Sequence, residues 1–203
     1  NQQQRYWATK GRKIGKMYMD VILDGGMLFL SAINNNSNTQ AKYIDHAQPG
    51  FVLQGGIDAM IDRGIRHTFA SFGCRLGYMS FSSSDSFGKY SGNGLHSTFN
   101  TGIHYVTKPG ADNKLRIALY GGGGLRFDNS NDYGTSAYYY FELNATKQFS
   151  KQFAAGISIA RYTALYATRY DYKRSYPYSS ADFNGLAIMA QMRVSLYKNK
   201  KKR

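Results

Sequence analysis

The sequence predicts an all-β protein, an eight-stranded antiparallel up-and-down barrel that crosses a membrane with its strands and has a filled polar lumen. Apolar and polar residues alternate with a period of two in eight segments of the chain, which is the pattern of strands with one apolar face. The connections between these segments alternate between long and short. No apolar run approaches the ~18 residues of a membrane helix, so any membrane span must be a strand.

The first predicted strand, 15–32, changes phase along its length. Its apolar residues share one parity up to Leu23, whereas Leu28 and Leu30 lie on the other parity. This shift predicts a β-bulge at Gly25–Gly26. A hairpin at 24–26 is the competing interpretation.

The next three predicted strands, 51–62, 66–81 and 94–107, keep a constant phase. Their apolar parities are Phe51, Leu53, Ile57, Ala59 and Ile61, then Ala70, Phe72, Cys74, Leu76 and Tyr78, then Leu95, Phe99, Ile103 and Tyr105. The opposite parities are Gln54, Asp58 and Asp62, then His67, Ser71 and Arg75, then His96, Thr98, Asn100 and His104.

The fifth predicted strand, 115–127, contains four consecutive glycines, 121–124. Glycine packs nothing and weakens a strand, so this run indicates a place where the sheet curves or another wall comes close. It would give room to Tyr120, Tyr138 and Tyr140 inside the barrel, or form an outer groove at Gly121 and Gly123.

The last three predicted strands are 137–146, 152–162 and 183–197. Their apolar parities are Tyr139, Phe141, Leu143 and Ala145, then Phe153, Ala155, Ile157 and Ile159, then Leu186, Ile188, Ala190, Met192, Val194 and Leu196. The polar parity holds Tyr138, Tyr140, Glu142, Asn144, Gln191 and Arg193.

The connections predict which ends of the strands lie together. Long loops are expected at 33–50, 82–93, 128–136 and 163–182, and short turns at 62–65, 108–114 and 147–151. In an up-and-down barrel all the long loops then emerge at one end, which is typical of outer-membrane barrels. A soluble lipocalin-like barrel would show the same alternation with its faces inverted.

The absence of lysine from the strand faces favours the membrane barrel. No lysine occurs in 51–61, 67–81, 95–106, 115–127, 137–146, 152–161 or 184–197, although a water-facing sheet uses lysine freely. The polar parity is therefore placed inside, where charges need partners. The predicted polar network of the lumen is Asp58, Arg75, Arg116, Arg126, Glu142 and Arg193. It would fill the interior; a narrow gated ion path is the alternative.

Over about 15–197 the chain resembles the small eight-stranded outer-membrane barrels, such as the transmembrane domain of outer-membrane protein A. The resemblance rests on strand number, loop alternation and face chemistry, and the Tyr-rich and Asn-rich loops are similar to those of small outer-membrane proteins of Bacteroidota. Such barrels usually end in an aromatic residue, which here is Tyr197, followed by 198–203. The resemblance implies a bacterial outer membrane, long loops outside and both termini in the periplasm.

The charge distribution divides the chain into three parts: a basic periplasmic extension, 1–14, the barrel, 15–197, and a basic periplasmic tail, 198–203. The net charge is +14, and most of the cations map to the end with the short turns. This basic rim is expected to dock an acidic partner or lipid phosphates. A solvated anchor at the lipid head groups is the alternative. Its predicted docking residues are Arg12, Lys13, Lys198, Lys200 and Lys201. No nucleic-acid partner is expected, because no basic face runs along any strand.

The loop 163–182 alternates tyrosines with cations and is the second predicted binding site. Its candidate residues are Tyr166, Arg169, Tyr170, Tyr172, Lys173 and Arg174. Aromatic rings beside arginines can bind sugar-phosphate head groups or a partner protein. An interfacial aromatic girdle with a solvated loop is the alternative.

The sequence indicates no catalytic site, cofactor or metal. His96 and Ser97 are adjacent and so point to opposite faces of their strand, which separates a possible base from a possible nucleophile. The expected function is non-enzymatic: a structural or accessory subunit of an envelope complex, in contact with outer-membrane lipid, lipopolysaccharide and another outer-membrane or periplasmic protein. A lipid-modifying outer-membrane enzyme and a soluble lipocalin-like ligand-binding barrel are the alternatives.

Overall fold

The chain forms one closed antiparallel barrel of eight strands in which neighbours in sequence are neighbours in space. The structure is a computed structural model that describes residues 17–35, 46–62, 67–85, 88–107, 114–128, 134–150, 152–169 and 181–196. The strands are β1 (Met17–Asn35), β2 (His46–Asp62), β3 (Thr68–Asp85), β4 (Gly88–Val106), β5 (Leu115–Asp128), β6 (Gly134–Gln148), β7 (Phe153–Arg169) and β8 (Ala181–Ser195). The predicted fold class is confirmed.

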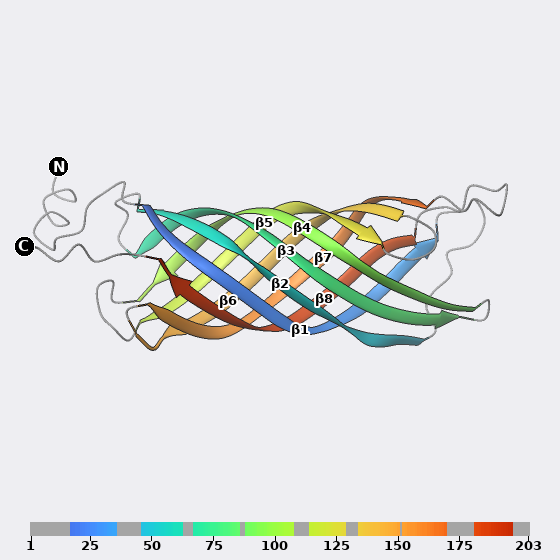
Figure 1. The fold of residues 1–203 in the computed structure, drawn as a ribbon, viewed down its shortest axis with the longest axis horizontal. Coiled ribbons are helices and arrows are strands. Elements are labelled where there is room, and N and C mark those ends of the chain that lie inside the picture. The colour runs from blue at the N-terminus through green and yellow to red at the C-terminus, as the bar shows by residue number, and fades with distance from the viewer. Residues whose placement is uncertain are drawn as a thin grey trace, which may run out of the picture.

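Figure 1 shows eight tilted strands around a single axis. We call the end at which β1 begins and β8 ends the terminal end, and the opposite end the loop end. β1 pairs with β2 on one side and with β8 on the other, which closes the wall. Because the wall is closed, the backbone N–H and C=O groups of every strand can form hydrogen bonds with a neighbouring strand, as the hydrocarbon region of a membrane requires. The segments 1–14 and 198–203 lie outside the described residues.

Side chains alternate between an apolar outer surface and a buried interior. On β5, Leu119 is 59% exposed and its neighbour Tyr120 is 1% exposed. The same alternation brings large apolar side chains to the outside of all eight strands and buries nearly all the described polar side chains of the other parity. No helix in the described part of the chain is long and apolar enough to cross a membrane.

All eight strands extend beyond their predicted bounds at the loop end, into the predicted long loops. The observed strands span 14 to 19 residues. β3 and β4 stay paired as far as Asp85 and Gly88, so most of 82–93 is strand, and parts of 33–50, 128–136 and 163–182 are strand as well. The prediction failed there because it relied on apolar alternation, which a strand loses once it leaves the membrane.

The predicted β-bulge at Gly25–Gly26 is wrong, and so is the competing hairpin. β1 pairs with β2 without interruption from Met17 to Leu28. Leu28 therefore points into the lumen, where it is fully buried. The prediction assumed that every large apolar residue of a strand faces outward. Part of this lumen is apolar, so Leu28 can face inward without any change in the alternation of β1.

His67 was predicted on the inner face of the third strand, and this is also wrong. It lies in the turn before β3, in a left-handed conformation with φ 64°. Its Nδ1 is 2.8 Å from the carbonyl oxygen of Val106, and its ring packs against Tyr105, whose side chain is exposed on the outer face.

The glycine run of β5 brings neighbouring backbones close together on the inner side. A Cβ added to Gly122 would lie 1.9 Å from the carbonyl oxygen of Phe99, and one added to Gly124 would lie 2.5 Å from the Tyr138 ring. On the outer side a Cβ at Gly121 would make only an ordinary contact, 3.6 Å from Phe141. The run therefore gives room to Tyr138, as the sequence suggested, and lets β4 approach β5.

Candidate functional site

The lumen gathers most of the charged side chains that the structure describes. The six residues of the predicted polar network all lie on its wall and are 0–8% exposed. Five of them form ion pairs with carboxylates or guanidinium groups. Arg126 lies nearer the loop end, opposite His96 across the β4–β5 ladder.

The first cluster of the lumen is centred on Arg75 of β3. Its guanidinium forms an ion pair with Glu142 of β6 and lies 3.2 Å from Asp24 of β1. The same nitrogen donates to the hydroxyl of Tyr140 at 2.5 Å. Gln191 donates to both carboxylates, at 2.7 Å to Asp24 and 3.2 Å to Glu142. One arginine thus joins three strands across the interior.

The second cluster lies nearer the terminal end and is centred on Arg193 of β8. Its Nη1 is 3.1 Å from Asp58 of β2 and 3.6 Å from Asp20 of β1. Arg116 of β5 pairs with the same Asp20 at 2.5 Å. Tyr120 donates to Asp58 at 2.5 Å and accepts a hydrogen bond from Arg193.

Gln191 connects the two clusters. Arg193 Nε donates to Gln191 Oε1 at 2.8 Å, while the amide nitrogen of Gln191 donates to the carboxylates beside Arg75. Buried charges are tolerated only when they are paired and hydrogen-bonded, and each ion pair here has additional hydrogen bonds. The two clusters therefore form one continuous network that links opposite walls of the barrel.

Asp20 and Asp24 supply two of the carboxylates and were not among the predicted lumen residues. Both are fully buried. They alternate strictly with Met19, Val21 and Leu23, which face outward. The alternation up to Leu23 is enough to place them inside, because the predicted bulge lies after both residues.

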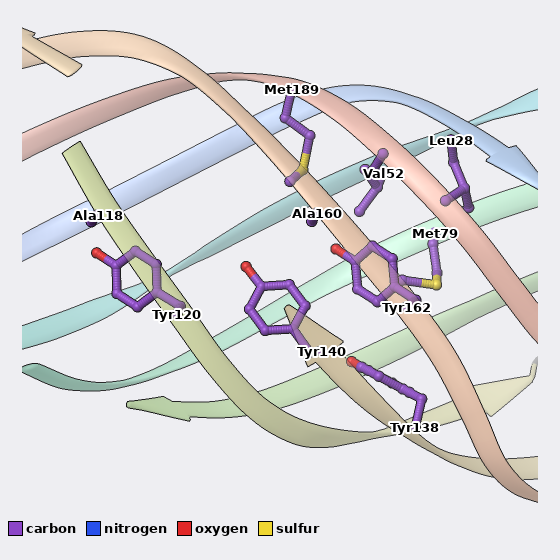
Figure 2. Close-up of a cluster of buried hydrophobic side chains, with 11 residues drawn as sticks. Leu28, Val52, Met79, Ala118, Tyr120, Tyr138, Tyr140, Ala160, Tyr162 and Met189 are labelled. Atoms are coloured by element: carbon purple, nitrogen blue, oxygen red, sulfur yellow. The ribbon is translucent and has the colours of Figure 1, made fainter. Parts of the chain in front are cut away.

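An apolar layer lies beside the network at the loop end. Figure 2 shows Tyr120, Tyr140 and Tyr162 spaced along the lumen, with Leu28, Val52 and Met79 near Tyr162, toward the end to which the β1 arrow points. These side chains are 0–1% exposed. Together with the network, this layer fills the lumen.

The histidines of β4 lie in the lumen, as predicted. His96 Nδ1 is 3.1 Å from the hydroxyl of Tyr138, and the half-buried Ser97 does not share its face. His104 Nε2 is 2.7 Å from Ser71 Oγ on β3, a serine–histidine contact that the sequence analysis did not foresee. No hydrogen bond to His104 Nδ1 is found within the described part of the chain, so the third group of a catalytic triad is missing there.

The two predicted docking surfaces fall mostly beyond the residues that the structure describes. Arg12, Lys13, Lys198, Lys200 and Lys201 lie outside them. Four residues of the predicted outer-loop site also lie outside them: Tyr170, Tyr172, Lys173 and Arg174. Tyr166 and Arg169 lie in β7. Within the described ranges, no group of three His, Cys, Asp or Glu side chains is placed to hold a metal ion.

Comparisons with known proteins agree with the fold. The chain is similar to the outer membrane protein OprG from Pseudomonas aeruginosa, with 10% identity and a TM-score of 0.54 over 92% of this chain and 100% of that one. It also matches an outer membrane channel from Pseudomonas putida F1, with 8% identity over 91% of this chain and 96% of that one, but the TM-score of 0.29 carries no argument. No family model and no curated protein matches.

The closed eight-stranded wall, the apolar outer surface and the polar, filled lumen define a class of protein, the transmembrane β-barrels. Within that class, the fold of this chain is similar to that of a small outer-membrane β-barrel. A soluble lipocalin-like barrel would have its faces inverted and is therefore excluded.

Proposed function

We propose that this barrel is a non-enzymatic structural or accessory subunit of an envelope complex. Its long loops face outward, and both termini lie in the periplasm. It docks a partner protein through the basic periplasmic rim and contacts lipopolysaccharide through the Tyr/Arg-rich outer loop. The observation that carries the proposal is the filled lumen, in which Arg75 and Arg193 are 1% exposed. Binding is then left to the rims and the outer wall.

The charge of the rim supports a protein partner. The extension 1–14 carries four cations, of which Arg12 and Lys13 are adjacent, and the tail 198–203 carries five cations in six residues. A dense cluster of one sign accelerates encounter with an acidic surface and orients it.

The environment of the serine–histidine contact supports a non-enzymatic function. Ser71 is 5% exposed and His104 is fully buried. The His104 ring packs edge-on against Tyr120 at 5.1 Å, within the second lumen cluster. Both groups are buried in the lumen, on the opposite side of the wall from a lipid substrate, so the contact serves to pair two buried polar groups.

A charge-neutralised variant tests the docking proposal. In it, Arg12, Lys13, Lys198, Lys200 and Lys201 are replaced by Gln. A matched control replaces five cations in or next to the long connections of the loop end: Lys42, Lys89, Arg169, Lys173 and Arg174. Both variants are purified from native membranes after mild cross-linking. We expect the first to fold, by heat-dependent gel mobility, but to lose the cross-linked partner that the parent and the control retain. Retention of the partner by the first variant would refute docking through the rim.

A second pair of variants tests the enzymatic alternative. Ser71→Ala and His104→Ala should leave the lipid A of the host membrane unchanged in its mass spectrum, because neither residue performs chemistry in this proposal. A change in lipid A that depends on the parent protein and is lost in both variants would establish an enzyme instead.

A further inference from the structure

We propose that Arg161, with Tyr139 and Thr163, binds a phosphate group of lipid A on the outer wall of the barrel, and that the acyl chains lie along the apolar strip beneath them. The assignment of this lipid to lipopolysaccharide rests on the orientation given in the proposed function. The site lies on the wall of β6 and β7 and is distinct from the outer loop.

The register places Arg161 near the loop end of the closed wall. It is exposed on the outer face of β7, opposite Phe141 of β6 and Leu186 of β8. Thr163, the next outward residue, forms the last pair of the β7–β8 ladder. Arg161 therefore lies two residues before the loop-end limit of the β7–β8 ladder, on the outer face of the wall.

The depth of Arg161 matters because an arginine on the lipid face costs about 2–4 kcal/mol at the bilayer midplane and only ~0–1 kcal/mol near the interface. From its position, a flexible arginine side chain can extend toward the head groups while its stem covers apolar surface. If an anionic group lies at the interface, its interaction with the Arg161 guanidinium makes this position of the arginine favourable.

No carboxylate competes for this guanidinium on the described outer surface. The acidic side chains that the structure describes are all buried in the lumen. They are Asp20, Asp24, Asp58, Asp62 and Glu142. A planar guanidinium with five N–H donors matches a phosphate group by two parallel hydrogen bonds.

Two further donors lie beside Arg161 on the same face. Tyr139 is 50% exposed and is paired with Thr163 across the β6–β7 ladder. Tyr139 is thus a diagonal neighbour of Arg161, within reach of a long side chain at roughly 7–8 Å between Cα atoms. A guanidinium and two hydroxyl groups can surround a phosphate without any repelling charge.

The surface below these donors is apolar. Phe141 is 58% exposed, Ile159 43% and Ile188 46%. These side chains continue along the wall toward the terminal end with Leu143 and Ile157, which are 51% and 59% exposed. Donors above and an apolar strip below match an amphiphile with a phosphorylated head group, and not free phosphate.

Lys147 provides a matched control. It is the other exposed cation among the described outward residues of β6 and β7, and it pairs with Leu115 and Ala155. It therefore lies near the terminal end, at the opposite leaflet. Its charge is the same, but its distance from Arg161 along the wall removes it from the proposed site.

The test measures lipid A bound to the purified barrel in detergent by native mass spectrometry. The probes are lipid A with both phosphates, dephosphorylated lipid A, and inorganic phosphate as competitor. The variants are Arg161→Gln and Lys147→Gln, with heat-dependent gel mobility as the folding control. We expect Arg161→Gln to lower the affinity for lipid A about tenfold, as loss of charge-assisted hydrogen bonds predicts. Lys147→Gln should match the parent.

The probes separate the lipid from other sources of phosphate. The parent should bind dephosphorylated lipid A as weakly as Arg161→Gln binds lipid A, and inorganic phosphate should compete poorly. Equal lipid A binding by Arg161→Gln and the parent would overturn the site, as would equal binding of the two lipids by the parent or efficient competition by free phosphate. If this test fails while the rim variant still loses its cross-linked partner, this site alone is refuted. If the rim variant retains the partner while lipid A binding behaves as expected, only docking through the periplasmic rim is refuted.

Discussion

Single residues decide whether this lumen is stable, because each charge inside it has specific partners. Arg75 is 1% exposed, forms ion pairs with two carboxylates and lies 5.2 Å above the centre of the Tyr120 ring. Removing one partner of a buried pair leaves the others desolvated and unpaired, which costs more than the pair itself contributes.

Arg75→Met should therefore lower the free energy of unfolding by about 3–5 kcal/mol. The variant leaves Asp24 and Glu142 buried without their cation. Urea unfolding in lipid vesicles, followed by gel mobility, measures the change. Arg161→Met, which removes an arginine from the outer face, is the control and should be nearly as stable as the parent; equal stability of Arg75→Met would contradict the network.

The inner and outer glycines of β5 should also differ. Gly122→Ala places a Cβ 1.9 Å from a backbone oxygen that cannot move aside, whereas Gly121→Ala adds only an ordinary contact. We expect a loss of about 1–3 kcal/mol for the first substitution, as for other overpacked sites, and little change for the second. The same unfolding assay compares them, and similar stabilities would show that β4 does not approach β5 so closely.

At the scale of the strand, the register of β1 determines which charges enter the lumen. The unbroken ladder with β2 places Asp20 and Asp24 inside together with Leu28. A shift of one residue would turn every later side chain of the strand to the other face.

Cysteine labelling tests this register directly. In a Cys74→Ser background, which removes the only cysteine, Met27→Cys should react with a lipid-soluble maleimide because Met27 is 51% exposed on the outer face. Leu28→Cys should remain unlabelled in the folded barrel. The reverse pattern would restore the bulge at Gly25–Gly26.

At the scale of the whole molecule, the two ends of the barrel differ in construction. At the loop end, the strand ladders end at different heights. The β4–β5 ladder stops at Gly94 and Asp128, whereas β3 and β4 remain paired as far as Asp85 and Gly88. At the terminal end, the described connections are short. Outer-membrane barrels have this asymmetry, with the longer structures outside the cell.

Epitope insertion tests the proposed orientation. An epitope within 36–45 should bind antibody on intact cells, because that segment connects β1 and β2 at the loop end. An epitope after residue 203 should bind only after the outer membrane is permeabilised. Binding of the second epitope on intact cells, with the first one hidden, would reverse the topology and assign Arg161 to the inner leaflet.

Local sequence patterns were sufficient to predict the architecture and the two faces of the wall. Period-two alternation reports a half-buried strand directly, and the missing lysines distinguish a confined interior from a water-facing surface. Both signals are local, so the eight strands and the inward placement of Arg75, Arg116 and Arg193 followed without coordinates.

Which of these residues contact one another could not be predicted from such local patterns. The contact of His104 with Ser71 and those of Arg193 with Asp20 and Asp58 join strands far apart in the chain. They depend on the stagger between strands, which backbone pairing sets around the whole barrel and which no single segment encodes. The same closure placed Leu28 inside and extended β3 and β4 beyond the apolar band, because backbone hydrogen bonds, unlike apolar alternation, continue where the membrane ends.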